Sequence, residues 1–546
     1  MIRLFSIICT CMALTMGFSS KALSEEDTCT PLLLGSLGDW KHQISTQSKK
    51  AQEFFDRGLA LTFGFNHDEA RRAFEKAAQL DSECAMCYWG MAYVLGPNIN
   101  AAMEDSAVPK AYAAIQKALR LANDASEKEQ AYIEALAKRY SSKAVQGRSA
   151  LDRVYADAMR KVHKRFPEDL DAAIFFAESL MNLSPWDYWT ADGNPKNHIK
   201  EVLETLEKAL KKDPNHPHGN HLYIHAVEAS KTPEKAVAAA DRLGSLVPGS
   251  GHLVHMPAHT YIRVGLYHKA SLANERAIEV DDKYKENCTS EGAYPLAYMP
   301  HNHHFLWASY TLEGRGKDSI RAARELVKRL NTEAMRTPEL GTLQHFWITP
   351  MVTLARFERW DDALKEPAPP KDLGYPIGMW HYLRGMAYAA KGNLPEAKKE
   401  LEELKPLTQD PRVNKIKIWG TNPVTNLLKI GEHILTGKIA EKQGKTKRAL
   451  AEYLRGKEIE DALYYDEPHS WYYPVRQVLG EFHLKMRNFD AAEIYFREDL
   501  DRHRENGWSL YGLKRALEGL KKKKEAQIVG QRLKQAWAHA DFKLEG

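Results

Sequence analysis

The sequence predicts an all-α protein built from stacked antiparallel helix pairs, and three observations support this fold class. Small and aromatic residues recur at fixed offsets along the chain. A short turn precedes the second helix of each expected pair. Alternating β-branched runs bounded by turn residues, which would indicate strands, are almost absent.

The recurring offsets are clearest near the start of the chain. Gly58, Ala70, Phe74 and Ala77 follow one another at intervals of 12, 4 and 3 residues. The small residues let two helices approach closely, and the aromatic ring fills the gap between them. Related sets recur later, namely Ala258, Ala270, Asn274 and Ala277; Gly385, Ala397 and Leu401; Gly437, Ala449 and Tyr453; and Gly480, Ala492 and Phe496.

This pattern resembles the tetratricopeptide repeat (TPR). The resemblance covers most of residues 51–533 and is best at 51–81, 251–281 and 380–407. It implies a right-handed superhelical solenoid in which the first helix of each pair lines a concave groove. It also implies that a protein, a peptide or a small ligand binds in this groove.

The first 22 residues have the pattern of a signal peptide. Arg3 precedes an apolar run over residues 4–18, and small residues precede a cleavage point after Ala22. The run is too short for a membrane span. We therefore expect a mature protein that is secreted or periplasmic. The rest divides into an N-terminal extension (23–50), a TPR-like block with the histidine-rich groove (51–365), a proline-rich linker (366–376) and a second TPR-like block (377–546).

Charge and motif content exclude several function classes. Lysine and arginine total 77 and aspartate and glutamate 72, so the net charge of +5 does not favour nucleic acid as a partner. The chain carries no GxSxG, GxxxxGK[ST] or GxGxxG motif. Repeat arrays of this kind often stand alone, and we expect a monomer.

Four cysteines follow the predicted cleavage point: Cys29, Cys84, Cys87 and Cys288. They allow three pairings. Cys84 and Cys87 lie at an expected helix start, where the helix N-terminus lowers the pKa of a thiol. A structural disulfide, a redox-active pair and free buried thiols are all open interpretations.

Histidine placement is the most informative chemistry. The chain has 22 histidines, and eleven lie between His216 and His304. His221, His225 and Glu228 stand at i, i+4 and i+7 and so share one helical face. A second cluster contains His252, His255 and His259, and in a third His301 and His304 share a face.

A proline lies at or near the expected helix start of each cluster. We therefore expect the imidazoles near the first turns of groove-lining helices on successive repeats, where the clusters converge. The positive helix N-terminus favours neutral imidazole, which is the form that binds metals. The predicted metal ligands are His221, His225, Glu228, His255, His259, His301 and His304. The metal is open among copper, zinc, iron and manganese.

Three functions are consistent with these patterns. The first is an exported solenoid that binds a ligand or partner in its groove and carries a histidine-rich metal site. The second is a metal-dependent enzyme, either an oxidoreductase or a hydrolase. The third is a metal-free scaffold for protein interactions. The aromatic segment 184–189 is either a lid over the groove or a packed loop.

Overall fold

The structure is a computed structural model that describes residues 36–287 and 292–544. The predicted signal peptide (1–22), Cys29 and Cys288 lie outside the described residues. Within the described ranges, no helix is long and apolar enough to cross a membrane.

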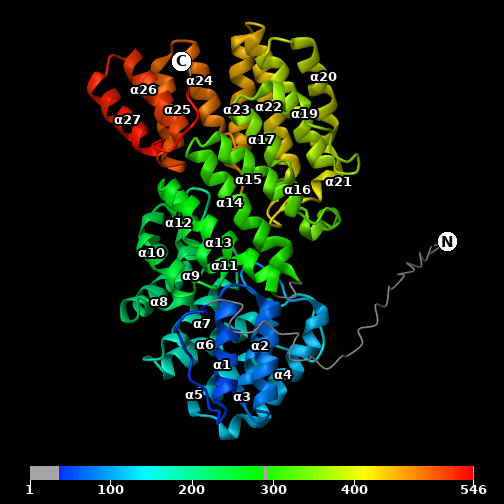
Figure 1. Ribbon diagram of the computed structural model, residues 1–546, viewed down its shortest axis with the longest axis vertical. Helices are drawn as coiled ribbons and strands as arrows, with labels where there is room; N and C mark the ends of the chain where they lie inside the picture. Colours follow the sequence, from blue (N-terminus) through cyan, green and yellow to red (C-terminus); the bar gives the residue numbers. More distant parts are fainter. Residues whose placement is uncertain (1–35, 288–291, 545–546) are drawn as a thin grey trace, which may run out of the picture.

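The described chain is almost entirely helical (Figure 1). The first part contains α1 (Lys49–Phe63), α2 (His67–Leu80), α3 (Ala85–Val94), α4 (Val108–Leu121), α5 (Glu127–Ala137), α6 (Ser149–Arg165), α7 (Leu170–Met181) and α8 (Ile199–Lys212). The middle contains α9 (Pro217–Glu228), α10 (Val237–Leu246), α11 (Gly251–His255), α12 (Pro257–Val264), α13 (Tyr267–Asn287), α14 (Met299–Leu312), α15 (Gly316–Arg329), α16 (Thr342–Trp347), α17 (Thr349–Arg356) and α18 (Trp360–Lys365).

The last part begins with α19 (Gly374–Ala390), α20 (Leu394–Leu404) and α21 (Pro411–Asn414), followed by a hairpin of two short antiparallel strands, β1 (Lys417–Ile418) and β2 (Asn422–Pro423). It ends with α22 (Val424–Lys442), α23 (Thr446–Asp461), α24 (Val475–Lys485), α25 (Phe489–Arg502), α26 (Gly507–Gly519) and α27 (Lys523–Ala536). Residues 366–373 of the predicted linker form the loop between α18 and α19, and residues 374–376 belong to the first turn of α19.

The small and aromatic residues pack as the repeat pattern predicts. Phe74 on α2 lies between Gly58 on α1 and Gly90 on α3, and a Cβ atom at either glycine would overlap its ring. Phe496 on α25 has the same relation to Gly480 and Gly512. One aromatic therefore fills the gap both within a helix pair and toward the next pair. This close approach confirms the interpretation of the pattern.

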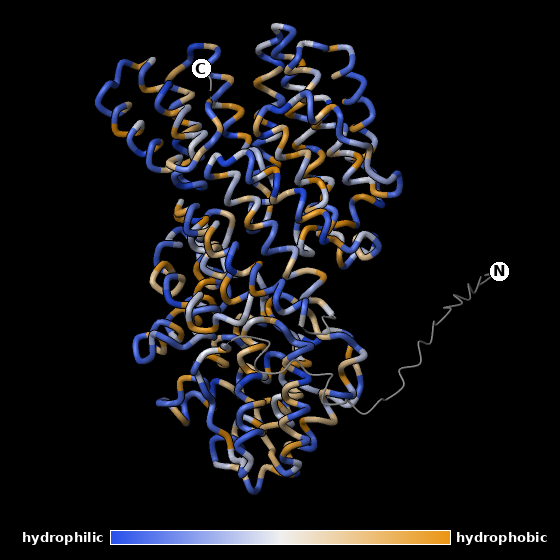
Figure 2. The backbone as a smooth tube through the Cα atoms, in the orientation of Figure 1, coloured by the Kyte–Doolittle hydropathy of each residue, from blue (hydrophilic) through white to orange (hydrophobic). Residues whose placement is uncertain are grey.

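All five predicted helix pairs are present, namely α1–α2, α12–α13, α19–α20, α22–α23 and α24–α25. The apolar faces of the first four pairs and of α24 join into one core that runs from Ile44 to Phe482, whereas α25 packs with α26 and α27 in a second cluster. Figure 2 shows hydrophobic residues distributed along the whole array rather than gathered at one centre. The all-α, TPR-like solenoid is confirmed.

The C-terminal helices fold back onto the middle of the chain. The Arg263 guanidinium donates to the Arg502 carbonyl oxygen at 3.1 Å, and Trp537 Nε1 donates to the Leu312 carbonyl oxygen at 3.2 Å. The backbone N–H of Asp541 donates to the Gly314 carbonyl oxygen at 3.1 Å. This closure places the loop between α23 and α24 against α12, and it builds one wall of the cavity described below.

Cys84 and Cys87 form a disulfide at the start of α3, and both residues are buried. A buried pair is inaccessible to redox partners, so the geometry supports the structural interpretation over the redox-active one.

Candidate metal centre

Helix α9 carries the first histidine cluster as predicted. His221, His225 and Glu228 lie on it and are fully buried. Pro217 occupies its first turn, but His225 and Glu228 lie in its last turn. The expectation that all clusters lie near helix starts was therefore wrong for α9.

The second cluster is divided between two helices. His252 and His255 belong to α11, and His259 belongs to the first turn of α12. The break occurs at Met256, because Pro257 has no N–H to donate to the preceding turn. The third cluster begins α14, with Pro300 in the first turn and His301 directly after it.

These helices bring six imidazoles into two groups. The first triad is His221, His225 and His252; the second triad is His255, His259 and His301. Within each triad, one ligand atom from every residue lies within 4.8 Å of the others, and all six residues are buried. The convergence predicted from the sequence is therefore present.

Glu228 lies between the two triads. One of its carboxylate oxygens is 2.9 Å from His225 Nδ1, and the other is 2.7 Å from His259 Nδ1. Burial alone would raise the pKa of Glu228, but His259 and His225 outweigh that effect and hold the pKa at about 2. An ionised carboxylate only accepts hydrogen bonds, so both Nδ1 atoms carry the proton. The Nε2 atoms of His225 and His259 are left with free lone pairs.

Asn274 fixes the tautomer of His255 in the same way. The Asn274 amide nitrogen donates to the Ala270 carbonyl oxygen at 2.8 Å, so its oxygen faces His255 Nδ1, at 2.6 Å. His255 Nδ1 is therefore the donor, and Nε2 carries the lone pair. His255 Nε2 lies 3.0 Å from His259 Nε2. With both rings neutral, two lone pairs face each other across this short distance.

His301 extends the second triad, with its Nε2 atom 3.4 Å from His259 Nε2. In the first triad, the Nε2 atoms of His252 and His221 are 3.3 Å apart. The Nδ1 atoms of His221, His252 and His301 and the Nε2 atom of His225 are buried without a hydrogen-bond partner. Of these four atoms only His225 Nε2 bears on a metal bound through Nε2, because His221, His252 and His301 meet their neighbours through Nε2; a buried polar atom without a partner is costly unless something binds it.

Burial lowers the pKa of five of these imidazoles, those of His221, His225, His252, His255 and His301, and so favours their neutral form. It lowers the pKa of His255 well below 6.5, and neighbouring His259 lowers it further. The same combination of burial and imidazole neighbours acts on His221, His252 and His301. The cause is therefore mainly burial rather than the helix N-termini invoked from the sequence.

Aromatic rings enclose both triads. Phe65 packs against His221 at 4.9 Å between ring centroids, and Phe305 packs against His259 at 4.4 Å. Trp186 meets His225 edge-on at 5.0 Å, and Trp419 meets His301 edge-on at 5.5 Å. Trp186 and Trp419 both have positive φ, +62° and +47°, which is uncommon for a bulky residue.

Two predicted ligands, Glu228 and His304, belong to neither triad; Glu228 groups with His225 and His259 as a third possible ligand set, whereas His304 belongs to no such set among the described residues. Its ring stacks on Trp307 and lies 5.5 Å from the ring of His345. His345 Nδ1 and the Tyr375 hydroxyl share one hydrogen bond, 2.9 Å long. His252 was recognised in the sequence as part of a cluster but was not predicted as a ligand, and the structure makes it a full member of the first triad.

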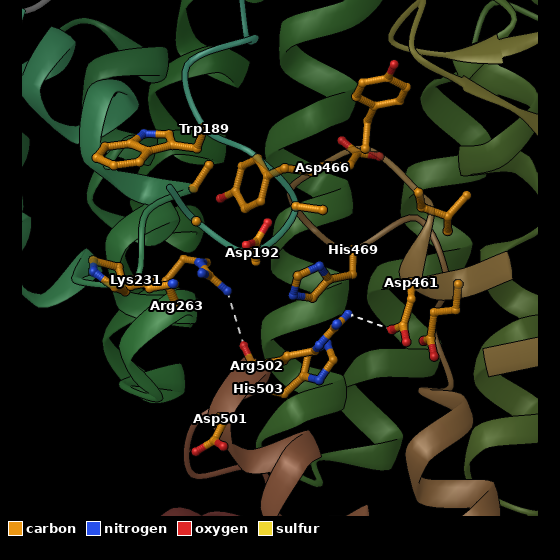
Figure 3. A pocket seen from close by; sticks show the side chains of 18 of the residues that line it. Trp189, Asp192, Lys231, Arg263, Asp461, Asp466, His469, Asp501, Arg502 and His503 are labelled. Carbon is orange, nitrogen blue, oxygen red and sulfur yellow. Dashed lines mark hydrogen bonds and ion pairs between the residues drawn. The ribbon is translucent and has the colours of Figure 1, made fainter. Parts of the chain in front are cut away.

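A cavity of about 1390 Å³ borders the centre (Figure 3). Trp186, which contacts His225, is part of its wall. Arg263 is also part of the wall, and its Nε donates to the Glu228 carbonyl oxygen at 2.8 Å. Within the segment 184–189, Trp186 thus contacts both a triad histidine and the cavity, while Trp189 Nε1 donates to the Ala226 carbonyl oxygen at 2.9 Å, so both interpretations of the segment, lid and packed loop, stay open.

No family model and no curated protein matches this chain. Among solved structures, the chain is similar to human IFIT1 bound to m7Gppp-AAAA, with 14% identity over 90% of this chain and 91% of IFIT1 and a TM-score of 0.32. It is also similar to a chain of the APC/C Cut9–Hcn1 hetero-tetramer, with 15% identity over 86% of this chain and 76% of that chain and a TM-score of 0.32. Likeness at this level assigns no function.

Proposed function

We propose that this protein is a metalloprotein whose two histidine triads hold first-row transition-metal ions, and that the centre is catalytic. The observation that carries the proposal is the opposed pair of Nε2 lone pairs on His255 and His259. Their Nδ1 protons are held by Asn274 and Glu228, so neither Nε2 can donate to the other while both rings are neutral. A cation between them would turn this repulsion into attraction.

The spacing supports the same conclusion. Metal–imidazole bonds are about 2.0–2.1 Å long, so two nitrogens on one ion lie about 3 Å apart. The Nε2 pairs His255–His259, His259–His301 and His221–His252 are separated by 3.0, 3.4 and 3.3 Å. In this proposal Glu228 hydrogen-bonds to one histidine of each triad and orients both rings, an arrangement common around metal ligands.

The number of ligands favours catalysis over a purely structural role. Structural zinc sites have four protein ligands, whereas catalytic sites have three and keep one position open. Each triad offers three imidazoles, and Trp186 both contacts His225 and lines a large cavity. All-imidazole sets suit copper, zinc, iron and nickel, and copper(II) binds such sets most tightly.

The test is the metal content of the mature protein, produced without a histidine tag. We compare wild type with His225→Ala and His259→Ala, and we use His345→Ala as the matched control because it is a buried histidine outside both triads. We expect up to two ions in the wild type and in His345→Ala, and fewer in each triad variant. Unchanged metal content in both triad variants would refute the proposal, as would a wild type that stays metal-free after loading.

Export and a monomeric state belong to the proposal as well. The charged and apolar pattern of residues 1–22 supports export, and N-terminal sequencing of the protein from a cell-envelope fraction tests it. Sequencing should start directly after Ala22. Light scattering of the same sample tests the monomer.

A further inference from the structure

The cavity beside the first triad has an unusual balance of charge. Eight carboxylate side chains and eight lysine or arginine side chains border it. Seven of these eight cations are already ion-paired with acidic residues; Arg502, for example, pairs with Asp461 at 3.0 Å, and Arg504 pairs with Glu234 at 2.8 Å. A wall of this kind carries little free charge, so it is a poor match for a phosphorylated or polyanionic ligand.

The same wall is unsuited to the common modes of peptide binding. Strand addition requires an exposed sheet edge, and of the short β1–β2 hairpin only Thr421, in its turn, borders the cavity. Docking of an amphipathic helix requires an apolar groove, whereas this lining is dense in charged groups. Phosphopeptide recognition requires unpaired arginines, which the ion pairs above remove.

What the wall does offer is fixed donors and acceptors beside aromatic faces. Paired guanidinium and carboxylate groups hold their planes in defined orientations. Five aromatic rings line the cavity: Trp186, Trp189, Tyr464, Tyr465 and Trp471. Hydroxyl groups both donate and accept hydrogen bonds, and the C–H faces of sugar rings pack on aromatic faces. Neutral polyhydroxylated rings meet all of these requirements together.

The cavity is also large enough for more than one ring. Its volume of about 1390 Å³ exceeds the range of about 300–1000 Å³ that is usual for a drug-sized ligand. Figure 3 shows His469 and His503 projecting into it, while Trp189 and Lys231 stand on the opposite side. A short oligomer of sugar units fits this volume better than a single ring.

We infer that this cavity binds a neutral oligosaccharide and presents it to the metal centre past Trp186. The link to the centre rests on the proposed function, whereas binding itself does not. Trp186 is the contact between the two, because its indole lines the cavity, meets His225 edge-on and donates to the Asn100 side chain at 3.0 Å.

The test is calorimetric titration of the full mature protein with neutral gluco-, manno- and N-acetylglucosamine oligosaccharides at millimolar concentration. Tyr464→Ala is the informative variant, since its side chain is 67% exposed and lines the cavity. Tyr511→Ala is the matched control, because Tyr511 lies on α26 outside the cavity. We expect at least one series to bind, Tyr464→Ala to weaken that binding about three- to tenfold, and Tyr511→Ala to leave it unchanged.

No binding by any of the three series would overturn the inference, as would equal losses in both tyrosine variants or binding of a peptide library in their place. Metal analysis of the same samples separates the two proposals. Metal without sugar binding refutes only the cavity inference, whereas sugar binding without metal refutes the proposed function and the link to the centre but leaves sugar binding by the cavity intact. In metal-loaded protein, saturating sugar should alter the optical or paramagnetic spectrum of the metal; an unchanged spectrum would overturn presentation past Trp186.

Discussion

Replacing Glu228 with glutamine tests the architecture of the centre most directly. The carboxylate accepts one N–H from His225 and one from His259. Glutamine keeps one accepting oxygen but places an NH₂ group where the second oxygen was. That NH₂ group cannot accept, so one of the two imidazoles must move its proton to Nε2. Its triad then loses a ligand, while the other triad keeps all three.

The expected magnitude follows from this loss. Removing a hydrogen-bond partner of a metal-bound histidine typically weakens metal binding 10- to 100-fold, or about 1.4–2.7 kcal/mol. We expect one of the two binding events to weaken by that factor and the other to stay near its wild-type affinity. Competition against a chromophoric chelator resolves the two events in one titration.

Asp171→Asn is the matched control. Asp171 is also a buried carboxylate between two histidines, with His42 Nδ1 at 2.6 Å and His216 Nε2 at 2.8 Å, but it lies outside the triads. Both substitutions leave a buried group unsatisfied, which costs stability by about 1–3 kcal/mol. Only Glu228→Gln should change metal affinity. The role given to Glu228 would be refuted if Glu228→Gln bound metal with wild-type affinity, or if Asp171→Asn lost as much metal affinity as Glu228→Gln.

Three further predictions concern the surroundings of the centre. Asn274→Leu removes the acceptor that holds His255 Nδ1, so metal affinity of the second triad should fall about tenfold in the same chelator competition; an unchanged affinity would contradict the tautomer assignment. His42→Gln should destabilise the protein in a pH-dependent way. Burial lowers the pKa of His42, but the nearby Asp171 carboxylate outweighs burial and raises the net pKa above 6.5. The stabilisation from this pair is therefore fully present below pH 6.5. It is lost as the pH rises through the raised pKa. Asp171 has a lowered pKa, so its own contribution is fully present above its ordinary value of 3.8 and is lost as the pH falls from there toward the lowered value. In urea unfolding, the free energy of unfolding of the wild type should exceed that of His42→Gln at mildly acidic pH, and the difference should shrink at alkaline pH. A difference that grows with pH would contradict the prediction. Finally, Cys84→Ala with Cys87→Ala should cost about 2 kcal/mol in unfolding free energy, the value expected for so short a closed loop, and should leave metal content unchanged.

The fold was largely predictable because its determinants are local. Gly58 and Phe74 belong to one helix pair, and their spacing alone predicts the close approach that the structure shows. The closure of the C-terminal helices onto α12 was not predictable, since Arg263 and Arg502 are far apart in sequence and no short-range pattern connects them. The same holds for the cavity, whose wall combines segments from the middle and the end of the chain.

The candidate centre was predictable in its members but not in its chemistry. Helical phasing identified six of the residues that form the triads or lie between them. It could not show whether Glu228 binds a metal directly or instead hydrogen-bonds to two histidines. Which nitrogen of each imidazole is free depends on acceptors supplied by other helices, such as Asn274 on α13. One signal was present in the sequence, because Asn274 stands where the other repeats carry an aromatic or leucine. A buried amide at this position weakens apolar packing and is costly unless a nearby group hydrogen-bonds to it. In this structure the hydrogen-bonding partner is His255 Nδ1, so the departure of Asn274 from the repeat pattern indicates where the candidate metal centre lies.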